Sequence, residues 1–184
     1  MASSLPLRAL VYSKHGNPSE VLRAMTFKPL PRPAQNQVQV KLLLSPINPA
    51  DLNVIEGVYP DRPAPRPDLE PYAPDVTLPA NPLFVAGSEA VGVVTDLGAG
   101  AHAGLNPGDK VVLDKSQLGA WATYQNVDAA HLHKVDSALS DVAAATMKVR
   151  RAPIRKLAIA ILLLIDQPTH GPTYATIVHK TVTR

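Results

Sequence analysis

One tyrosine, Tyr59, stands in a setting where its hydroxyl could do chemistry. It follows an Asn-Pro-Ala-Asp segment at residues 48–51 and sits between Gly57 and Pro60. Asp51 is placed to start a short helix ahead of apolar residues, and Gly57 is placed to end it. A phenol held just past a helix end can present its hydroxyl to a ligand. The alternative is a packing residue at a loop end, whose hydroxyl meets only water.

The segment that contains Tyr59 needs a framework, and short apolar runs separated by turns predict one made of strands. The predicted strands are residues 7–12, 21–27, 38–44, 84–98, 110–113, 119–124 and 131–135. Glycines at positions 87 and 92 interrupt the fourth run, which suggests a bulge or a close backbone approach. A further helix is expected over residues 140–147, with an acidic residue in its first turn. The pattern indicates a mainly β fold with short helices, in the form of a small barrel or sandwich.

Composition excludes several classes of site and partner. The chain has 184 residues and no cysteine, so it holds no disulfide, thiolate zinc site or cysteine nucleophile. Residues 148–184 carry seven Lys or Arg and one acid, whereas residues 1–147 carry eleven Lys or Arg and fourteen acids. The body is therefore acidic and is not expected to bind nucleic acid. The longest apolar run, nine residues at 157–165, is shorter than the roughly 20 that span a membrane.

A glycine-rich stretch at residues 98–104 superficially resembles a phosphate-binding loop. Such a loop needs a helix directly after it. Here an Asn-Pro-Gly-Asp turn at residues 106–109 and a strand follow instead. We therefore interpret residues 98–104 as a hairpin connection.

Four motifs, in this order along the chain, resemble the medium-chain dehydrogenase/reductase superfamily. They are the segment at residues 48–60, Gly-Ser-Glu-Ala-Val-Gly at 87–92, Asn-Pro-Gly-Asp-Lys-Val at 106–111 and Leu-Gly-Ala-Trp-Ala-Thr-Tyr at 118–124. Within the superfamily, the first motif is most similar to the mitochondrial 2-enoyl thioester reductases, also called trans-2-enoyl-[acyl-carrier-protein] reductases. The resemblance covers about residues 7–147.

The resemblance implies a GroES-like β-barrel catalytic domain over residues 1–147. In the family a Rossmann domain that binds NADPH follows this barrel, and the enzyme is a homodimer. It also implies a mitochondrial location, although residues 1–14, with two basic residues and no acid, are only weakly typical of a targeting sequence.

The resemblance also assigns roles to individual residues. Tyr59 matches the proton donor of the family, which protonates the substrate after hydride has reached it. Asn48 and Asp51 lie where the superfamily shapes the nicotinamide side of the cleft, so they are predicted to contact the cofactor; capping the short helix is their alternative role. Asn48 and Ser88 stand where the zinc-dependent branch has cysteine and histidine, so no catalytic zinc is expected. Glu89 is then expected to be a structural group inside the barrel. Trp121 is expected in the core.

The resemblance ends at Lys148-Val149-Arg150. The 37 residues from position 148 onward are too few for a dinucleotide-binding domain. We therefore expect the Rossmann domain to be missing and the chain to be inactive alone. Because Lys-Val-Arg can be encoded by a splice-donor sequence, residues 148–184 are hypothesised to be a translated intron. Within this basic and apolar tail, residues 154–165 are predicted to form an apolar basic helix.

Three functions stay open at this point. The first is NADPH-dependent reduction of enoyl thioesters, carried by acyl carrier protein or coenzyme A, in mitochondrial fatty-acid synthesis. The second is a quinone reductase of the same superfamily. The third is a non-catalytic module that binds a partner or modulates full-length subunits.

Overall fold

The computed structural model describes residues 6–73, 82–101, 104–147 and 159–162. Its strands are β1 (Leu7–Tyr12), β2 (Arg23–Phe27), β3 (Gln37–Ile47), β4 (Phe84–Val85), β5 (Val91–Leu97), β6 (Lys110–Leu113), β7 (Tyr124–Asp128), β8 (Leu132–Lys134) and β9 (Ile159–Leu162). Its helices are α1 (Pro18–Val21), α2 (Pro49–Glu56) and α3 (Asp141–Ala145), with 3-10 turns at Pro67–Tyr72 and Ala129–His131.

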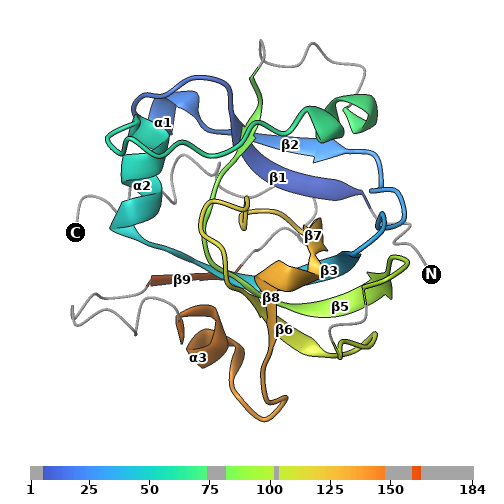
Figure 1. Cartoon of the computed structure of the whole chain (residues 1–184). Helices are drawn as coiled ribbons and strands as arrows, with labels where there is room; N and C mark the ends of the chain where they lie inside the picture. The colour runs from blue at the N-terminus through green and yellow to red at the C-terminus, as the bar shows by residue number, and fades with distance from the viewer. Residues whose placement is uncertain (1–5, 74–81, 102–103, 148–158, 163–184) are drawn as a thin grey trace.

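Two antiparallel sheets face each other in Figure 1, with α2 beside them at one end. The smaller sheet has the strand order β2-β1-β4, and the larger has the order β7-β3-β5-β6-β8, with β9 also on β3. Every strand pair of the described chain is antiparallel. The described residues therefore contain no parallel strand–helix–strand unit of the kind that binds a dinucleotide.

Residues 121–123, just before β7, form hydrogen bonds to both sheets. The N–H of Leu10 on β1 donates to Trp121 O at 2.9 Å, and the N–H of Thr123 donates to Arg8 O at 2.9 Å. On its other side, Thr123 O accepts from the N–H of Leu42 on β3, also at 2.9 Å. These bonds join β1 to β3 through one chain segment, and so the mainly β barrel predicted from the sequence is confirmed.

The core lies between the two sheets, and β3 contributes to both sides of it. The fully buried side chains of this core include Val11, Phe27, Val38, Val40, Leu69, Leu83, Val94 and Val111. β3 pairs with β5 on one edge and with β7 on the other, and consecutive side chains along it are buried, so both of its faces are covered over much of its length. This position explains its near-continuous apolar sequence.

Most predicted strands are present, with shifted ends. The run at 21–27 begins with the end of α1, so its strand starts at Arg23. The run at 84–98 divides into β4 and β5 because Gly87, at φ +92°, turns the chain away from a strand. Residues 120–123 bridge the sheets and only Tyr124 begins a regular strand. The helix predicted at 140–147 is α3, and the stretch 98–104 lies between the antiparallel strands β5 and β6, as a hairpin connection should.

The helix predicted over residues 154–165 is wrong in the part that the structure describes. Residues 159–162 form β9, which pairs antiparallel with Leu44, Ser45, Pro46 and Ile47 of β3. A short apolar run fits a strand or a helix equally well. β7 pairs only with residues 37–41 of β3, which leaves this further edge available. The other residues of that prediction lie outside the described part of the chain.

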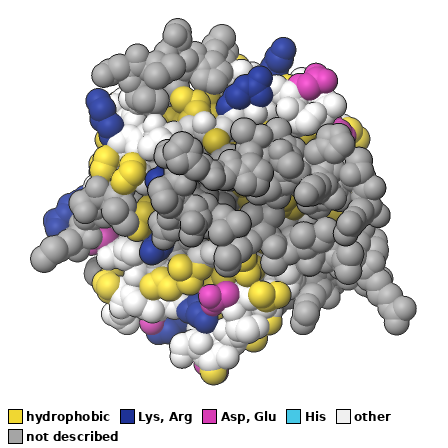
Figure 2. Space-filling model, turned by 180° about the vertical axis from the view of Figure 1, so that it is seen from behind, with side chains coloured by type: hydrophobic (Ala, Val, Ile, Leu, Met, Phe, Trp, Pro, Cys, Tyr) yellow, Lys and Arg dark blue, Asp and Glu magenta, His cyan; other side chains and the backbone are white. Residues whose placement is uncertain are grey.

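On the one face that Figure 2 shows, the described Lys and Arg side chains lie at several separate places. On the face opposite to that in Figure 1, the visible Lys and Arg side chains are separated by apolar and acidic ones (Figure 2). Among the residues that the structure describes, no helix has the length and apolar character needed to cross a membrane.

Candidate functional site

The start of α2 is held by hydrogen bonds between Asn48 and Asp51, two of the predicted site residues. The N–H of Asn48 donates to Asp51 Oδ2 at 2.9 Å, and the N–H of Asp51 donates to Asn48 O at 2.9 Å. Pro49 fills the first helical position, where its missing N–H costs nothing. Asn48 is 8% exposed and Asp51 2% exposed. The helix therefore begins at a buried polar turn, as expected from the capping role.

The end of α2 is equally constrained. Gly57 has φ +80°, and its N–H donates to Val54 O at 3.1 Å. A Cβ at this position would lie 2.5 Å from Arg62 Nη1 and 2.9 Å from the His15 ring. The imidazole of His15 is held in turn by a 3.2 Å contact between its Nδ1 and Ile55 O. A side chain at this position would be strained and would crowd His15, so glycine is strongly favoured in this turn.

Tyr59 leaves this turn toward solvent. Its side chain is 38% exposed, and Val58 beside it is 65% exposed. The side-chain amide of Asn53, one turn back in α2, donates to Tyr59 Oη at 3.4 Å. Because the phenol oxygen accepts this bond, its own proton stays available for another acceptor. The placement agrees with presentation to a ligand, and the catalytic role of Tyr59 stays a prediction.

The carboxyl group of Asp51 is held in an unusual electrostatic environment. Burial raises its pKa above the ordinary value, while the N–H and side chain of Asn48 and the hydroxyl and N–H of Ser88 act in the opposite direction. No cation contributes to the shift. Oδ1 is buried and has no hydrogen bond of good geometry in the described part of the chain. Asp51 is therefore a buried and incompletely hydrogen-bonded acceptor at the start of the helix that precedes Tyr59.

We expect Asp51 to make the chain less stable as pH rises. Its pKa is higher in the folded than in the unfolded chain, so between these two values the folded state binds more protons. The free energy of unfolding should therefore fall with rising pH relative to an Asp51→Asn variant, which lacks the titration. Urea unfolding of both chains at pH 4, 5, 6 and 7 would measure the difference. A difference that stays constant over this range would contradict the prediction.

Tyr12, Ser88 and Gln117 complete the surroundings of Asp51. Together with Asp51 they line a cavity of about 10 Å³ beneath α2. Tyr12 is 1% exposed, and its pKa is raised to about 12 by burial, against the opposing charge of Arg62. No local pattern marks Tyr12 or Gln117 as functional, because Tyr12 has the pattern of an ordinary strand residue and Gln117 that of a loop residue. That residues 12 and 51 line one cavity depends on the folded chain, and no local pattern reveals it.

The remaining sequence predictions near the site concern metal binding and packing. The described residues contain no group of three or more His, Cys, Asp or Glu side chains placed to hold a metal ion. Glu89 is 6% exposed, as expected of a structural group inside the barrel. Trp121 is 3% exposed and its indole N–H donates to Pro46 O at 3.1 Å. Its prediction as a core residue is confirmed, and it also braces the chain just before Asn48.

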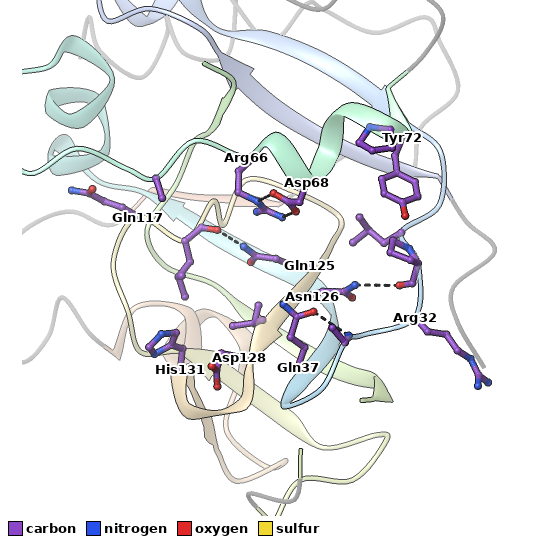
Figure 3. A pocket seen from close by; sticks show the side chains of 17 residues that line it. Arg32, Gln37, Arg66, Asp68, Tyr72, Gln117, Gln125, Asn126, Asp128 and His131 are labelled. Atoms are coloured by element: carbon purple, nitrogen blue, oxygen red, sulfur yellow. Dashed lines mark hydrogen bonds and ion pairs between the residues drawn. The ribbon is translucent and has the colours of Figure 1, made fainter. Parts of the chain in front are cut away.

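Figure 3 shows a second, larger cavity of about 560 Å³, which Tyr59 does not line. Arg66 and Asp68 form a bidentate ion pair on one side of it, with both N–O distances at 2.8 Å. His131 and Asp128 lie on the other side. Gln117 lines both cavities, whereas Tyr59, Asn48 and Asp51 do not line the large one. The large cavity is therefore not the site that the sequence predicts, because none of the three predicted site residues lines it.

Comparisons with known proteins match this architecture. Residues 34–137 match the model of the alcohol dehydrogenase GroES-like domain. The mitochondrial enoyl-[acyl-carrier-protein] reductase of Schizosaccharomyces pombe is 42% identical over 144 residues, which are 77% of this chain and 36% of that protein.

Solved structures agree with the sequence matches. A complex of Etr1p with NADP and crotonyl-CoA superposes with a TM-score of 0.69 at 28% identity, over 79% of this chain and 41% of that one. The quinone oxidoreductase of Escherichia coli in complex with NADPH gives a TM-score of 0.57 at 31% identity, over 76% and 36%. The chain thus spans about two fifths of the length of the proteins it matches. By its fold and its sequence, the chain belongs to the alcohol dehydrogenase GroES-like domain family.

Proposed function

We propose that this chain is the catalytic-domain part of an NADPH-dependent reductase of trans-2-enoyl thioesters, with acyl carrier protein or coenzyme A as the carrier. The observation that carries the proposal is the exposed hydroxyl of Tyr59, held by Asn53 at a helix end whose start is buried. The similarity to mitochondrial enoyl-[acyl-carrier-protein] reductases supports the substrate class and a mitochondrial role in fatty-acid synthesis.

The proposed chemistry needs one acidic group from this chain. NADPH, when bound, supplies a hydride to the β-carbon of the enoyl group. Negative charge then moves onto the thioester carbonyl and the α-carbon. The Tyr59 hydroxyl hydrogen-bonds this charge and transfers its proton to the α-carbon, which completes the reduction. A positioned general acid of this kind contributes about 10²–10⁴-fold to a rate.

Asn48 and Asp51 have a supporting place in this proposal. Asn48, with 8% of its surface exposed, is the member of the pair that retains some access to a cofactor. Asp51 is 2% exposed, so it acts through its bond to the Asn48 N–H. The nucleotide half of NADPH finds no parallel strand–helix unit among the described residues, so we propose that another part of the enzyme holds it.

The purified chain is therefore expected not to bind NADPH with micromolar affinity. Titration of NADPH fluorescence with the full chain would measure this directly. The Schizosaccharomyces pombe reductase, of which this chain spans 36%, serves as the positive control. Micromolar binding by this chain alone would contradict the proposal that another part of the enzyme holds the nucleotide half of NADPH.

A chimera tests the function itself. Residues 1–147 of this chain would replace the matching part of the Schizosaccharomyces pombe reductase, to which the chain is 42% identical. We expect the chimera to oxidise NADPH in the presence of crotonyl-CoA, because the exchanged part keeps the Tyr59 turn. A folded chimera that binds NADPH yet leaves crotonyl-CoA unreduced would overturn the proposal.

The second candidate function is quinone reduction, favoured by the 31% identity to the Escherichia coli quinone oxidoreductase. The same chimera, assayed with a benzoquinone, separates the two. A quinone takes up a hydride and a proton to become a hydroquinone. The proton goes to an oxygen atom and can come from water, so the reduction should not depend on Tyr59. Quinone turnover that exceeds crotonyl-CoA turnover would favour this second candidate.

A further inference from the structure

The small cavity beneath α2 is bordered by two buried oxygen atoms with complementary needs. Tyr12 Oη and Asp51 Oδ1 are both shielded from solvent, and neither has a hydrogen-bond partner of good geometry in the described chain. Both residues line the same cavity of about 10 Å³. An unpaired buried polar group is costly, and native proteins rarely leave two of them around one cavity.

The donor and acceptor roles of these two atoms are defined by their electrostatics. Burial raises the pKa of Tyr12 to about 12, so its hydroxyl keeps its proton at neutral pH and can donate. An ionised Asp51 can only accept. A cavity of this volume is at the lower limit of what one water molecule occupies, and a buried water needs two to four polar partners. Ser88 and Gln117, which also line the cavity, can provide the third.

We propose that this cavity binds one water molecule, which accepts a hydrogen bond from the Tyr12 hydroxyl and donates one to Asp51 Oδ1. Tyr12 on β1 is thereby a positioning residue for α2. The link runs from β1 through the water to Asp51, and from Asp51 Oδ2 to the N–H of Asn48, where the helix begins. Asp51 then has a donor on each oxygen.

The water site rests on the fold alone, whereas its effect on catalysis rests on the proposed function of Tyr59. The groups facing Asp51 are Asn48 and Ser88, with Tyr12 across the cavity, and Arg62 carries the charge that acts on Tyr12. Loss of the Tyr12 hydroxyl removes one donor from this set and leaves the others in place. The carboxylate should then be harder to ionise.

The test uses the full chain with ¹³C-labelled aspartate. Water–protein cross-relaxation by NMR should detect a long-lived water beside Tyr12 in the unsubstituted chain. In Tyr12→Phe the carboxyl titration of Asp51 should move to higher pH, and the folded-to-unfolded ratio should fall roughly fivefold. Tyr72→Phe, which removes a hydroxyl from the large cavity, is the matched control and should leave the Asp51 titration unchanged.

Two results would overturn the proposal. One is an unchanged Asp51 titration in a folded Tyr12→Phe chain. The other is a direct hydrogen bond between Tyr12 and Asp51, with no long-lived water, in the unsubstituted chain. This second result can be obtained even if Tyr12→Phe does not fold. In the chimera, Tyr12→Phe should lower kcat more than it changes KM. A normal kcat combined with a shifted Asp51 titration would keep the water site and contradict only its role in placing Tyr59.

Discussion

Tyr59→Phe in the chimera is expected to lower kcat for crotonyl-CoA by about 10²–10⁴-fold, the usual contribution of a positioned general acid. Phenylalanine keeps the ring but removes the proton and the hydrogen bond to the developing charge. NADPH affinity should be unchanged, because the substituted group serves the thioester. Since the side chain is 38% exposed and its bond with Asn53 is long at 3.4 Å, stability should change by less than about 0.5 kcal/mol.

Two further variants make this result specific. Tyr72→Phe loses a hydroxyl in the large cavity and should retain the activity of the chimera. Asn53→Ala leaves the phenol in place but removes the side-chain amide that donates to it, so a smaller loss than that of Tyr59→Phe is expected. Single-turnover measurements with saturating NADPH would separate the chemical step from binding. Full activity of Tyr59→Phe would show that another group, or water, supplies the proton.

The position of Tyr59 could be predicted because the signals that set it are local. A proline at the first helical position, an acid three residues after Asn48 and a glycine at the end define α2 within ten residues. The alternative capping role of Asn48 and Asp51 agrees with the geometry, but the helix begins at Pro49 and not at Asp51, where the sequence pattern placed its start. The barrel could be predicted as a class, because each strand carries its own apolar pattern.

What the sequence did not show depends on contacts between distant residues. Tyr12 meets the surroundings of Asp51 only after β1 has been placed against α2. Gly87, at the break between β4 and β5, lies against Trp121, from a segment more than thirty residues later. The strand at residues 159–162 depends on a free edge of β3, which exists only once β7 has paired with residues 37–41. None of these contacts has a local sequence signature.

Gly87→Ala is expected to destabilise the chain by roughly 2–5 kcal/mol. The left-handed conformation, at φ +92°, costs alanine about 1–2 kcal/mol. Crowding adds to this, because the new Cβ would lie 2.4 Å from Trp121 Cδ1 and 2.8 Å from the Trp121 backbone nitrogen. Overpacking of this kind costs about 1–3 kcal/mol. Thermal unfolding followed by circular dichroism should show Tm lowered by roughly 4–20 °C.

Gly108→Ala separates the two causes. Gly108 has nearly the same φ, +93°, but a Cβ there would meet no atom within 4 Å, so only the conformational cost of about 1–2 kcal/mol should appear. Equal losses in the two variants would mean that Trp121 yields without cost. If instead Gly87→Ala loses more, the crowding must displace Trp121, whose indole N–H holds Pro46 O just before Asn48. The disturbance then reaches the start of α2, and tryptophan fluorescence should change in Gly87→Ala and not in Gly108→Ala.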